Sequence, residues 1–369
     1  MLKDHYETII VGAGPAGLAC ALTLKKLGAE DFVVLERFEF PRDKCCAGYI
    51  TGKTRLAYEN FGLNIEDCRY SFIEDFGIWY DGAERQEILN RFLYTNDRID
   101  RVELDHAFFK LAREKGVAIE ESCRVSAVDP AARTVTVNDS ITVGFGSLVF
   151  ADGTVGIGSK LQEAEDPRTG RKKNIAMQMI FKSDRPDGIE LHFGIAPKGY
   201  GWISSCGGIT NAGITDEFRR DADYHELFAR YLRATGFDPD ALEAEGRAAA
   251  PDGKPQLHAA FTPIGLRKPV IGDCIYYAGD ALGACDPFTL SGLRYGLKSG
   301  QLAAEAIAEG DPGRLKSYVR GLKAKYGFSR FLMKLFYLRP ITFLILKVGC
   351  RWFGGIIAFT FNNFFINKK

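Results

Sequence analysis

One stretch near the N-terminus constrains the fold of this 369-residue chain more than any other. Residues 7–11 have the composition of a short buried β-strand, residues 12–17 are Gly-Ala-Gly-Pro-Ala-Gly, and residues 18–27 continue with helical apolar spacing. A second apolar strand over residues 32–35 ends in Glu36, 24 residues after Gly12. Strand, glycine turn, helix, strand and acid in this order predict a βαβ unit that binds a dinucleotide.

The glycines of this unit have separate physical tasks. Gly12 permits the tight turn, Gly14 lets the backbone approach a pyrophosphate at the helix N-terminus, and Gly17 allows close packing of the helix on the strand. Glu36 can accept a hydrogen bond from a ribose hydroxyl. The motif alone leaves open whether the dinucleotide is NAD or FAD.

A second motif lies near the other end of the chain. Residues 275–283 are a strand followed by Gly-Asp and a turn of small residues, and residues 286–292 lead into a helix over residues 293–308. This segment resembles the second FAD fingerprint of flavoproteins of the p-hydroxybenzoate hydroxylase type. The resemblance implies that Asp280 binds the ribityl chain, and that the backbone of Gly292 and Leu293 faces the pyrimidine edge of the flavin. Amides at a helix N-terminus also suit the negative charge of a reduced flavin.

Three further segments narrow the resemblance to the geranylgeranyl reductase family. Residues 41–48 resemble its PRxKxCGG loop, which lies over the isoalloxazine ring, and residues 101–105 resemble its R-x-x-F-D segment, in which the Arg contacts the cofactor. Residues 199–203 and 211–214 resemble its GYxWxFP and xNVGI strands, which line the substrate cavity. Together with the two fingerprints, the similarity spans residues 6 to about 308.

The chain departs from the family pattern at several positions. Cys45 stands where Pro is usual, Ala47 replaces the first glycine after the loop cysteine, and residues 204–205 are Ser-Ser in place of Phe-Pro. Residues 151–153 keep the Ala-Asp-Gly core of a third motif, but its Ser-x-x-Arg tail is degraded at residues 158–160. These changes leave FAD binding in place and leave the substrate open.

The resemblance implies a set of candidate site residues. The predicted cofactor-binding residues are Gly12, Gly14, Ala16, Gly17, Glu36, Arg37, Cys46, Ala47, Gly48, Arg101, Val125, Asp280, Gly292 and Leu293. Cys46 is the candidate catalytic residue, because its thiol either orients substrate or donates a proton beside the flavin. The alternative for Cys46 is a small apolar packing residue.

Four other candidates have either two interpretations or a limited role. Arg101 is either a cofactor clamp or a solvated charge at a helix start. Val125 is expected to offer only its backbone to the adenine side of the cofactor. Tyr200 and Trp202 lie two apart on a strand and share one face, so they either hold an apolar substrate chain or belong to the core.

Composition excludes several classes of function. The 48 Lys and Arg against 47 Asp and Glu give a net charge of +1, which offers no global case for nucleic-acid binding. Nine cysteines without CxxC spacing favour a reducing compartment, with neither a disulfide framework nor an iron–sulfur cluster. The five histidines are scattered, so no metal site is predicted. We expect a cytoplasmic protein, because glycines and acids interrupt any signal-like N-terminus.

The last part of the chain is unusually aromatic. Eight of the 27 Phe residues lie from Phe331 onward, and the longest uncharged run there, residues 352–367, has 16 residues. A spanning helix needs roughly 20 mostly apolar residues, so a transmembrane helix is not expected. The tail is either a set of apolar helices packed over the catalytic domain or an interfacial segment at the inner membrane surface.

These observations predict an α/β fold: a Rossmann-like FAD-binding domain of three-layer ββα type, an inserted antiparallel-sheet substrate domain, and a C-terminal helical tail. The FAD-binding domain is expected to be discontinuous. Its predicted ranges are residues 1–67, 96–165 and 266–310, those of the substrate domain are 68–95 and 166–265, and the tail covers 311–369.

The expected activity is reduction of C=C bonds in a polyprenyl lipid by hydride transfer from reduced FAD. The electrons are expected from a transiently bound external reductant, either NAD(P)H or a ferredoxin-like carrier, because no second Gly-rich nucleotide unit is evident. The alternatives are an FAD-dependent monooxygenase of a hydrophobic substrate, a quinone-linked electron-transfer flavoprotein, and non-enzymatic flavin storage or sensing.

Overall fold

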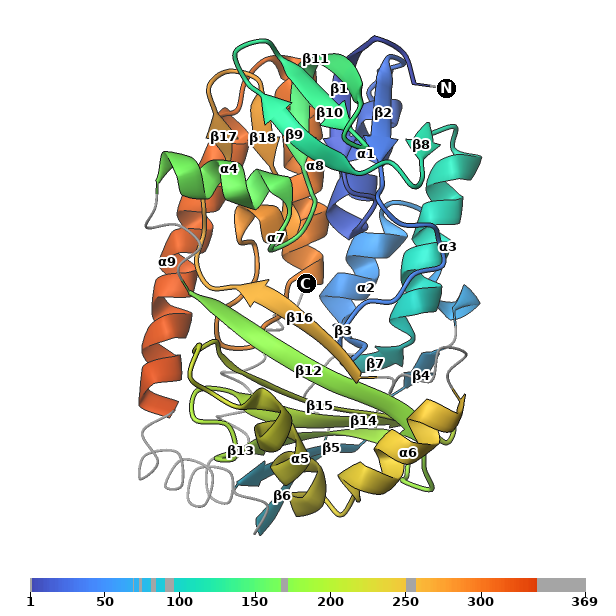
Figure 1. Ribbon diagram of the computed structural model, residues 1–369, viewed down its shortest axis with the longest axis vertical. Coiled ribbons are helices and arrows are strands. Elements are labelled where there is room, and N and C mark those ends of the chain that lie inside the picture. The colour runs from blue at the N-terminus through green and yellow to red at the C-terminus, as the bar shows by residue number, and fades with distance from the viewer. Residues whose placement is uncertain are drawn as a thin grey trace.

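The computed structural model describes residues 2–68, 70–72, 75–80, 84–89, 96–166, 172–249 and 257–336, and it has a parallel sheet above a separate antiparallel sheet (Figure 1). The parallel sheet has the strand order β17-β18-β11-β1-β2-β8, and its strands are parallel except for the edge strand β17, which is antiparallel to β18. Its strands are β1 (His5–Val11), β2 (Phe32–Leu35), β8 (Ile119–Glu120), β11 (Ile141–Phe150), β17 (Val270–Ile271) and β18 (Ile275–Tyr277). Segments from both ends of the described chain therefore meet in one sheet.

Both faces of this sheet are covered, which explains the continuous apolar runs of its central strands. Helix α1 (Pro15–Lys26), α3 (Arg101–Glu114) and α8 (Leu293–Glu309) contribute to one core, and β9 (Val125–Asp129) and β10 (Thr134–Val137) to the other. β9 and β10 form an antiparallel extension of β11. α4 (Ile157–Glu165) and the short α7 (Gly279–Leu282) complete this half of the molecule.

The second sheet has the order β16-β12-β15-β14-β13-β5-β6 and is antiparallel except for the parallel pair β13 and β5. Its strands are β5 (Asp75–Tyr80), β6 (Glu84–Leu89), β12 (Lys173–Lys182), β13 (Gly188–Phe193), β14 (Tyr200–Cys206), β15 (Ile209–Glu217) and β16 (Leu257–Pro263). α5 (Tyr224–Ala234) packs against one face through Leu227 and Tyr231, and α6 (Pro239–Ala249) lies beside it (Figure 1). The predicted α/β class, with a Rossmann-like sheet and a separate antiparallel sheet, is confirmed.

A third, small sheet lies between the other two. It has the order β3-β7-β4 and consists of β3 (Tyr49–Thr51), β7 (Asn96–Ile99) and β4 (Tyr70–Phe72). α2 (Gly52–Glu59) and a 3-10 turn (Ile65–Asp67) adjoin it. Because β3 follows directly on residues 41–48, this sheet fixes the C-terminal end of that loop.

The last described helix, α9 (Gly313–Phe336), packs against the parallel-sheet half. Leu315, Val319, Leu322 and Tyr326 are its buried side chains in the two cores there. The rest of the predicted tail, residues 337–369, lies outside the described residues. Within the described part of the chain, no helix combines the length and the hydropathy needed to cross a bilayer.

The approach of α1 to α8 depends on a glycine that the sequence motifs do not include. A Cβ added to Gly300 in α8 would lie 2.0 Å from the carbonyl oxygen of Ala16 in α1. Backbone is the obstacle here, so the added atom cannot be accommodated by rotation of a side chain. Gly321 in α9 is a helical glycine without such an obstacle and provides the control, because a Cβ added there meets nothing within 4 Å.

We expect Gly300→Ala to lower the free energy of unfolding by about 1–3 kcal/mol, the usual cost of overpacking. Gly321→Ala should leave it unchanged or raise it by about 0.5–1 kcal/mol, because Ala favours a helix over Gly. Urea unfolding of both variants measures the difference. Equal stabilities of the two variants would contradict the close contact of α1 and α8.

Candidate active site

The glycine turn after β1 has the geometry that its sequence predicts. Gly12 has φ of +101°, and an added Cβ would lie 2.6 Å from the carbonyl oxygen of Ala151. An added Cβ on Gly17 would lie 1.9 Å from the carbonyl oxygen of Gly12. Gly14 is different, because the nearest atom to a Cβ added there would be Nη2 of Arg42, at an ordinary contact distance of 3.6 Å. Two glycines therefore serve internal packing, and the third leaves the start of α1 open toward a cation.

Glu36 is buried at the end of β2 and holds this turn in place. Its Oε2 accepts a hydrogen bond from the amide of Ala13 at 2.8 Å, and its Oε1 accepts one from the amide of Phe38 at 3.0 Å. A carboxylate oxygen can accept more than one hydrogen bond, so the ribose contact of Glu36 stays a prediction. The predicted contact of Arg37 with the cofactor also stays a prediction. The Arg37 guanidinium lies 4.5 Å from the centre of the Phe38 ring.

Arg42 supplies the positive charge beside the turn. Its guanidinium stacks over the Phe40 ring at 4.8 Å, and its Nε is buried with no hydrogen-bond partner among the described residues. A buried donor without a partner is costly unless a ligand satisfies it. An unsatisfied cation next to Gly14 and the N-terminus of α1 fits the pyrophosphate of a dinucleotide.

The second motif lies against the first. An added Cβ on Gly279 would lie 2.8 Å from Cβ of Ala16, and one on Gly292 would lie 3.4 Å from Oδ1 of Asp280. Gly292 begins α8 without a side-chain cap, so the first amides of that helix have no side-chain acceptor. Lys44 reaches the Asp280 carboxylate from the 41–48 loop, with 3.8 Å between Nζ and Oδ2. Asp280, Gly292 and the start of α8 are thus brought together beside the glycine turn.

The loop before α8 is held by a buried carboxylate. Oδ1 of Asp286 accepts hydrogen bonds from the amides of Phe288 and Thr289, at 3.0 and 3.1 Å. Oδ2 accepts one from the Ser329 hydroxyl of α9 at 2.9 Å. From the other side, the Tyr200 hydroxyl of β14 donates to the carbonyl oxygen of Thr289 at 2.9 Å. This loop is therefore fixed by both α9 and the antiparallel sheet.

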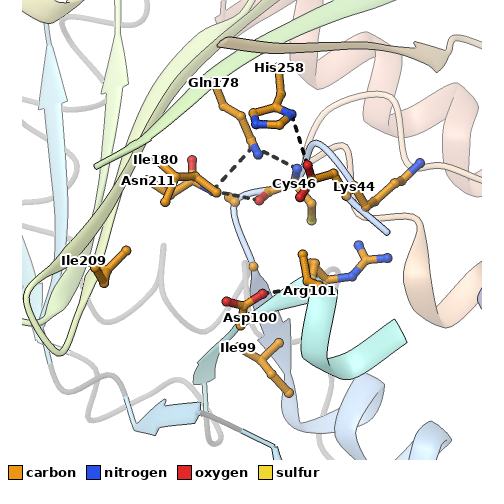
Figure 2. Close-up of a pocket in the computed structure, with 14 residues that line it drawn as sticks. Lys44, Cys46, Ile99, Asp100, Arg101, Gln178, Ile180, Ile209, Asn211 and His258 are labelled. Carbon is orange, nitrogen blue, oxygen red and sulfur yellow. Dashed lines mark hydrogen bonds and ion pairs between the residues drawn. The ribbon is translucent and has the colours of Figure 1, made fainter. Parts of the chain in front are cut away.

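Two amide side chains of the antiparallel sheet hold the peptide units on both sides of Cys46 (Figure 2). The amide of Cys46 donates to Oε1 of Gln178 at 2.8 Å, and its carbonyl accepts from Nδ2 of Asn211 at 2.9 Å. Oδ1 of Asn211 in turn accepts from the indole Nε1 of Trp202 at 3.1 Å. β12 and β15 thus fix the backbone that carries the Cys46 thiol.

Cys46 lines a pocket between the two halves of the molecule (Figure 2). The apolar part of the wall comes from Ile99, Val102, Ile180 and Ile209. The remaining wall is polar or consists of loop residues: Asp43, Lys44, Ala47, Gly48, Asp100, Arg101, Gln178, Asn211 and His258. The pocket therefore combines predicted flavin-binding residues with side chains of the antiparallel sheet.

Cys45 differs from its neighbour. Its thiol lies 3.8 Å from the carbonyl oxygen of Ala176 and 3.9 Å from that of His258, and Cys45 is not among the residues that line the pocket. Burial raises the pKa of the Cys45 thiol to about 12, which keeps it protonated. Cys45 and Cys46 are both free.

Arg101 begins α3 and forms a buried ion pair within that helix. Its Nη2 lies 2.9 Å from Oδ1 and 3.0 Å from Oδ2 of Asp105. Burial opposes the charge of Arg101, but the Asp105 carboxylate outweighs this and raises the pKa of the guanidinium. Arg101 lines the pocket, and its contact with a cofactor stays a prediction.

The predicted substrate and adenine contacts also stay predictions. Tyr200 and Trp202 both lie on β14, but neither is among the residues that line the Cys46 pocket. Trp202 is 5% exposed and its indole fills the space over Gly213, where an added Cβ would lie 2.1 Å from the ring. Val125 is the buried first residue of β9.

Several site residues were not identified as such from the sequence. Asp105 could have been found, because it lies four residues after Arg101 on one helix face. Asn211 lies in the xNVGI-like segment that was recognised, but no contact was assigned to it. Gln178, Asp286 and Ser329 become evident only when β12, the loop before α8 and α9 are placed in space.

Two nucleotide-binding motifs on one parallel sheet, closed by a second sheet over a shared pocket, define a flavin-dependent oxidoreductase. Residues 9–66 match the model of the pyridine nucleotide-disulphide oxidoreductase family. The chain is 28% identical over 355 residues to menaquinone reductase of Mycobacterium tuberculosis, and the alignment covers 89% of this chain and 83% of that protein. It is 27% identical over 349 residues to digeranylgeranylglycerophospholipid reductase 1 of Methanococcoides burtonii, covering 88% and 81%.

Solved structures share the fold. A geranylgeranyl bacteriochlorophyll reductase-like protein from Thermoplasma acidophilum superposes with a TM-score of 0.72 at 17% identity, covering 91% of this chain and 88% of that one. The flavin-dependent brominase Bmp2 gives a TM-score of 0.67 at 20% identity, covering 92% and 89%. The resemblance of the chain to the FAD-dependent oxidoreductases, and to the geranylgeranyl reductases among them, is confirmed.

The Ala-Asp-Gly motif yields a pH-dependent prediction. Oδ2 of Asp152 accepts from the amide of Gly158 at 2.9 Å, while Oδ1 is buried without a partner among the described residues. Burial raises the pKa of Asp152 from 3.8 to about 6. The raised pKa favours the folded state below about pH 4, and this advantage is lost as the pH rises through 6.

We expect Asp152→Asn to stabilise the protein at neutral pH by up to about 3 kcal/mol and to have little effect below about pH 4. The exposed Asp184 gives the matched control, and Asp184→Asn should change stability by less than about 0.5 kcal/mol at either pH. Urea titrations at the two pH values measure this. A gain for Asp152→Asn that is independent of pH would contradict the raised pKa.

The two hydrogen bonds that Gln178 and Asn211 form with the Cys46 backbone, the Cys46 cradle, predict an effect of Asn211→Ala. This change leaves the carbonyl of Cys46 and the indole N–H of Trp202 without their partner, at a cost of about 1–3 kcal/mol for each buried group that stays unsatisfied. The Cys46 thiol should then react with iodoacetamide at a different rate, while Cys45 should not change. Peptide mass mapping of the alkylated protein separates the two thiols. An unchanged Cys46 rate together with unchanged stability would contradict the cradle.

Proposed function

We propose that this protein reduces isolated C=C bonds in the polyprenyl chain of a lipid. The observation that carries the proposal is Cys46, whose backbone is held by Gln178 and Asn211 in a pocket whose apolar wall is Ile99, Val102, Ile180 and Ile209. An isoprene unit offers no polar group for recognition, so an apolar wall with one positioned proton donor suits it. Relatives named for geranylgeranyl lipid and menaquinone reduction support the same reaction class.

The residues present fit FAD. The open side of Gly14, the unpartnered Nε of Arg42 and the start of α1 would hold its pyrophosphate. Asp280 and the uncapped amides at the start of α8 would hold the ribityl chain and the pyrimidine edge. When bound in its reduced form, the flavin supplies the hydride, and NAD(P)H or a ferredoxin-like carrier supplies the electrons for its reduction.

The chain itself supplies position and the proton. The hydrogen bonds from Gln178 and Asn211 fix the backbone of Cys46, so its Cβ has one position in the pocket and the thiol reaches the substrate carbon by rotation about a single bond. Cys46 donates its proton to one carbon of the double bond while the other carbon receives the hydride, and the thiolate then regains a proton from solvent. The apolar wall of Ile99, Val102, Ile180 and Ile209 would limit the contact of the reacting carbons with water until the product leaves and solvent reaches the thiolate.

Cys45 provides a matched control for the role of Cys46. We expect Cys46→Ala to lower the turnover number about 10²–10⁴-fold, the usual contribution of a general acid, and to retain bound flavin. Cys45→Ala should keep most of the activity, because its thiol lies outside the pocket lining. Anaerobic reduction of the flavoprotein with dithionite, followed by mass spectrometry of added geranylgeranyl lipid or menaquinone, measures the products.

The mass of the product separates the proposal from its rival. Gain of a pair of hydrogens for each bond is the expected result, and in heavy water both are deuterium, because dithionite supplies only electrons and the flavin N5 hydrogen and the thiol proton both come from solvent. Unaltered lipid under anaerobic conditions, with a gain of oxygen in air, would instead identify a monooxygenase. That rival uses the same fold, as the similarity to a flavin-dependent brominase illustrates.

A further inference from the structure

The charges of this chain are divided unevenly between its two parts. Of the 48 Lys and Arg, 12 lie in residues 312–369, whereas all 47 Asp and Glu precede Pro312. Residues 1–311 therefore carry a net charge of −11 and residues 312–369 a net charge of +12, although the whole chain is at +1. A segment this basic with no acids is suited to an anionic partner.

The described portion of that segment is α9, and its cations form a stripe. Lys316, Arg320, Lys323, Arg330 and Lys334, the α9 stripe, are all exposed and are separated by four, three, seven and four residues. Intervals of three, four and seven repeat on one face of an α-helix, so the stripe runs along one side of α9 for roughly 27 Å. The buried Leu315, Val319, Leu322 and Tyr326 lie on an adjacent side of the helix, about a quarter turn from the stripe.

The α9 stripe is not neutralised by the rest of the described chain. Arg314, which lies off the stripe, pairs with Glu305 at 2.9 Å and with Glu309 at 3.5 Å. No carboxylate of a described residue lies within ion-pair distance of the five stripe residues. Helix α9 runs along an outer edge of the molecule, from the parallel-sheet half toward the antiparallel sheet (Figure 1).

Aromatic side chains accompany these charges. Phe331 is 56% exposed beside Arg330, and Phe328 is 40% exposed on the preceding turn. Beyond α9 the sequence continues with six more Phe residues and no acid. Basic residues together with exposed aromatics are characteristic of segments that lie on an anionic bilayer, where the cations meet headgroups and the rings reach the acyl boundary.

We propose that the α9 stripe docks the protein onto an anionic phospholipid membrane. Each Lys or Arg near such a surface strengthens binding by about fivefold, and salt screens the attraction. An acidic protein, such as an electron carrier, would also be attracted to the cations. The exposed phenylalanines favour the membrane, because rings beside cations can enter the acyl boundary of a bilayer, whereas the attraction to an acidic protein draws on the cations alone.

The test uses the full-length, oxidised flavoprotein and co-sedimentation with vesicles. Two vesicle types are compared, phosphatidylcholine alone and phosphatidylcholine mixed with phosphatidylglycerol. The stripe variant is Lys316→Gln/Arg320→Gln/Lys323→Gln, in which Gln keeps a good helix former at each position. The control variant removes the same charge from three exposed lysines on α1, α3 and α4, as Lys26→Gln/Lys110→Gln/Lys160→Gln. Flavin absorbance and circular dichroism confirm that both variants are folded.

We expect the wild type to bind the anionic vesicles, to release them as salt is raised, and to bind phosphatidylcholine much more weakly. The stripe variant should lose roughly a hundredfold in partition coefficient, and the control variant should stay close to the wild type. Equal binding by the wild type and the stripe variant would overturn the proposal. Equal losses in both variants would also overturn it, because the net charge of the protein, and not the position of the stripe, would then determine binding to the vesicles.

A parallel measurement addresses the acidic-protein alternative. The wild type could fail to bind either vesicle type but bind a [2Fe–2S] ferredoxin through the stripe residues. In that case the stripe binds an acidic protein and the membrane proposal fails. Turnover of a lipid dissolved in detergent micelles is measured separately for each variant. Retained turnover without vesicle binding would overturn the docking proposal alone, and vesicle binding without turnover would overturn the proposed function alone.

Discussion

The site depends on a contact between two backbones. The carbonyl of Ala16 in α1 occupies the place that a side chain at position 300 of α8 would need, and Gly279 brings the second motif against the same alanine. Only glycine permits these distances, since the obstacles at Gly300 and Gly17 are main-chain atoms. The start of α1 thereby lies against Gly296 and Gly300, one to two turns into α8, so one extended ligand can run from the positive end of α1 to that of α8.

The antiparallel sheet contributes to the same site by a different means. It does not bring another backbone into contact with the glycine turn, but reaches the 41–48 loop with two amide side chains, Gln178 and Asn211. Tyr200 makes an analogous contact with the loop before α8. The two loops next to the predicted cofactor position are therefore fixed by side chains of the second sheet, and the relative placement of the sheets determines where the Cys46 thiol lies.

Much of this arrangement could be predicted because it follows from local backbone requirements. A glycine turn between a buried strand and a helix has few alternatives, so β1, α1, β2 and the role of Gly17 follow from the order of residues. Gln178 could not be predicted, because its partner is 132 residues away and only the register of β12 brings it to Cys46. Asp105 is intermediate, since helical spacing places it beside Arg101 but does not reveal that the pair is buried.

Asp286 connects the charged helix to the site. One of its carboxylate oxygens accepts from the Ser329 hydroxyl of α9, and the other holds Phe288 and Thr289 in the loop before α8. Burying a carboxylate is costly unless hydrogen bonds compensate, so these contacts fix α9 and the loop relative to each other. A helix that docks on a surface would therefore set the orientation of the loop and of the Cys46 pocket relative to that surface. For a substrate confined to a bilayer, such an orientation restricts the directions from which its chain can approach the pocket.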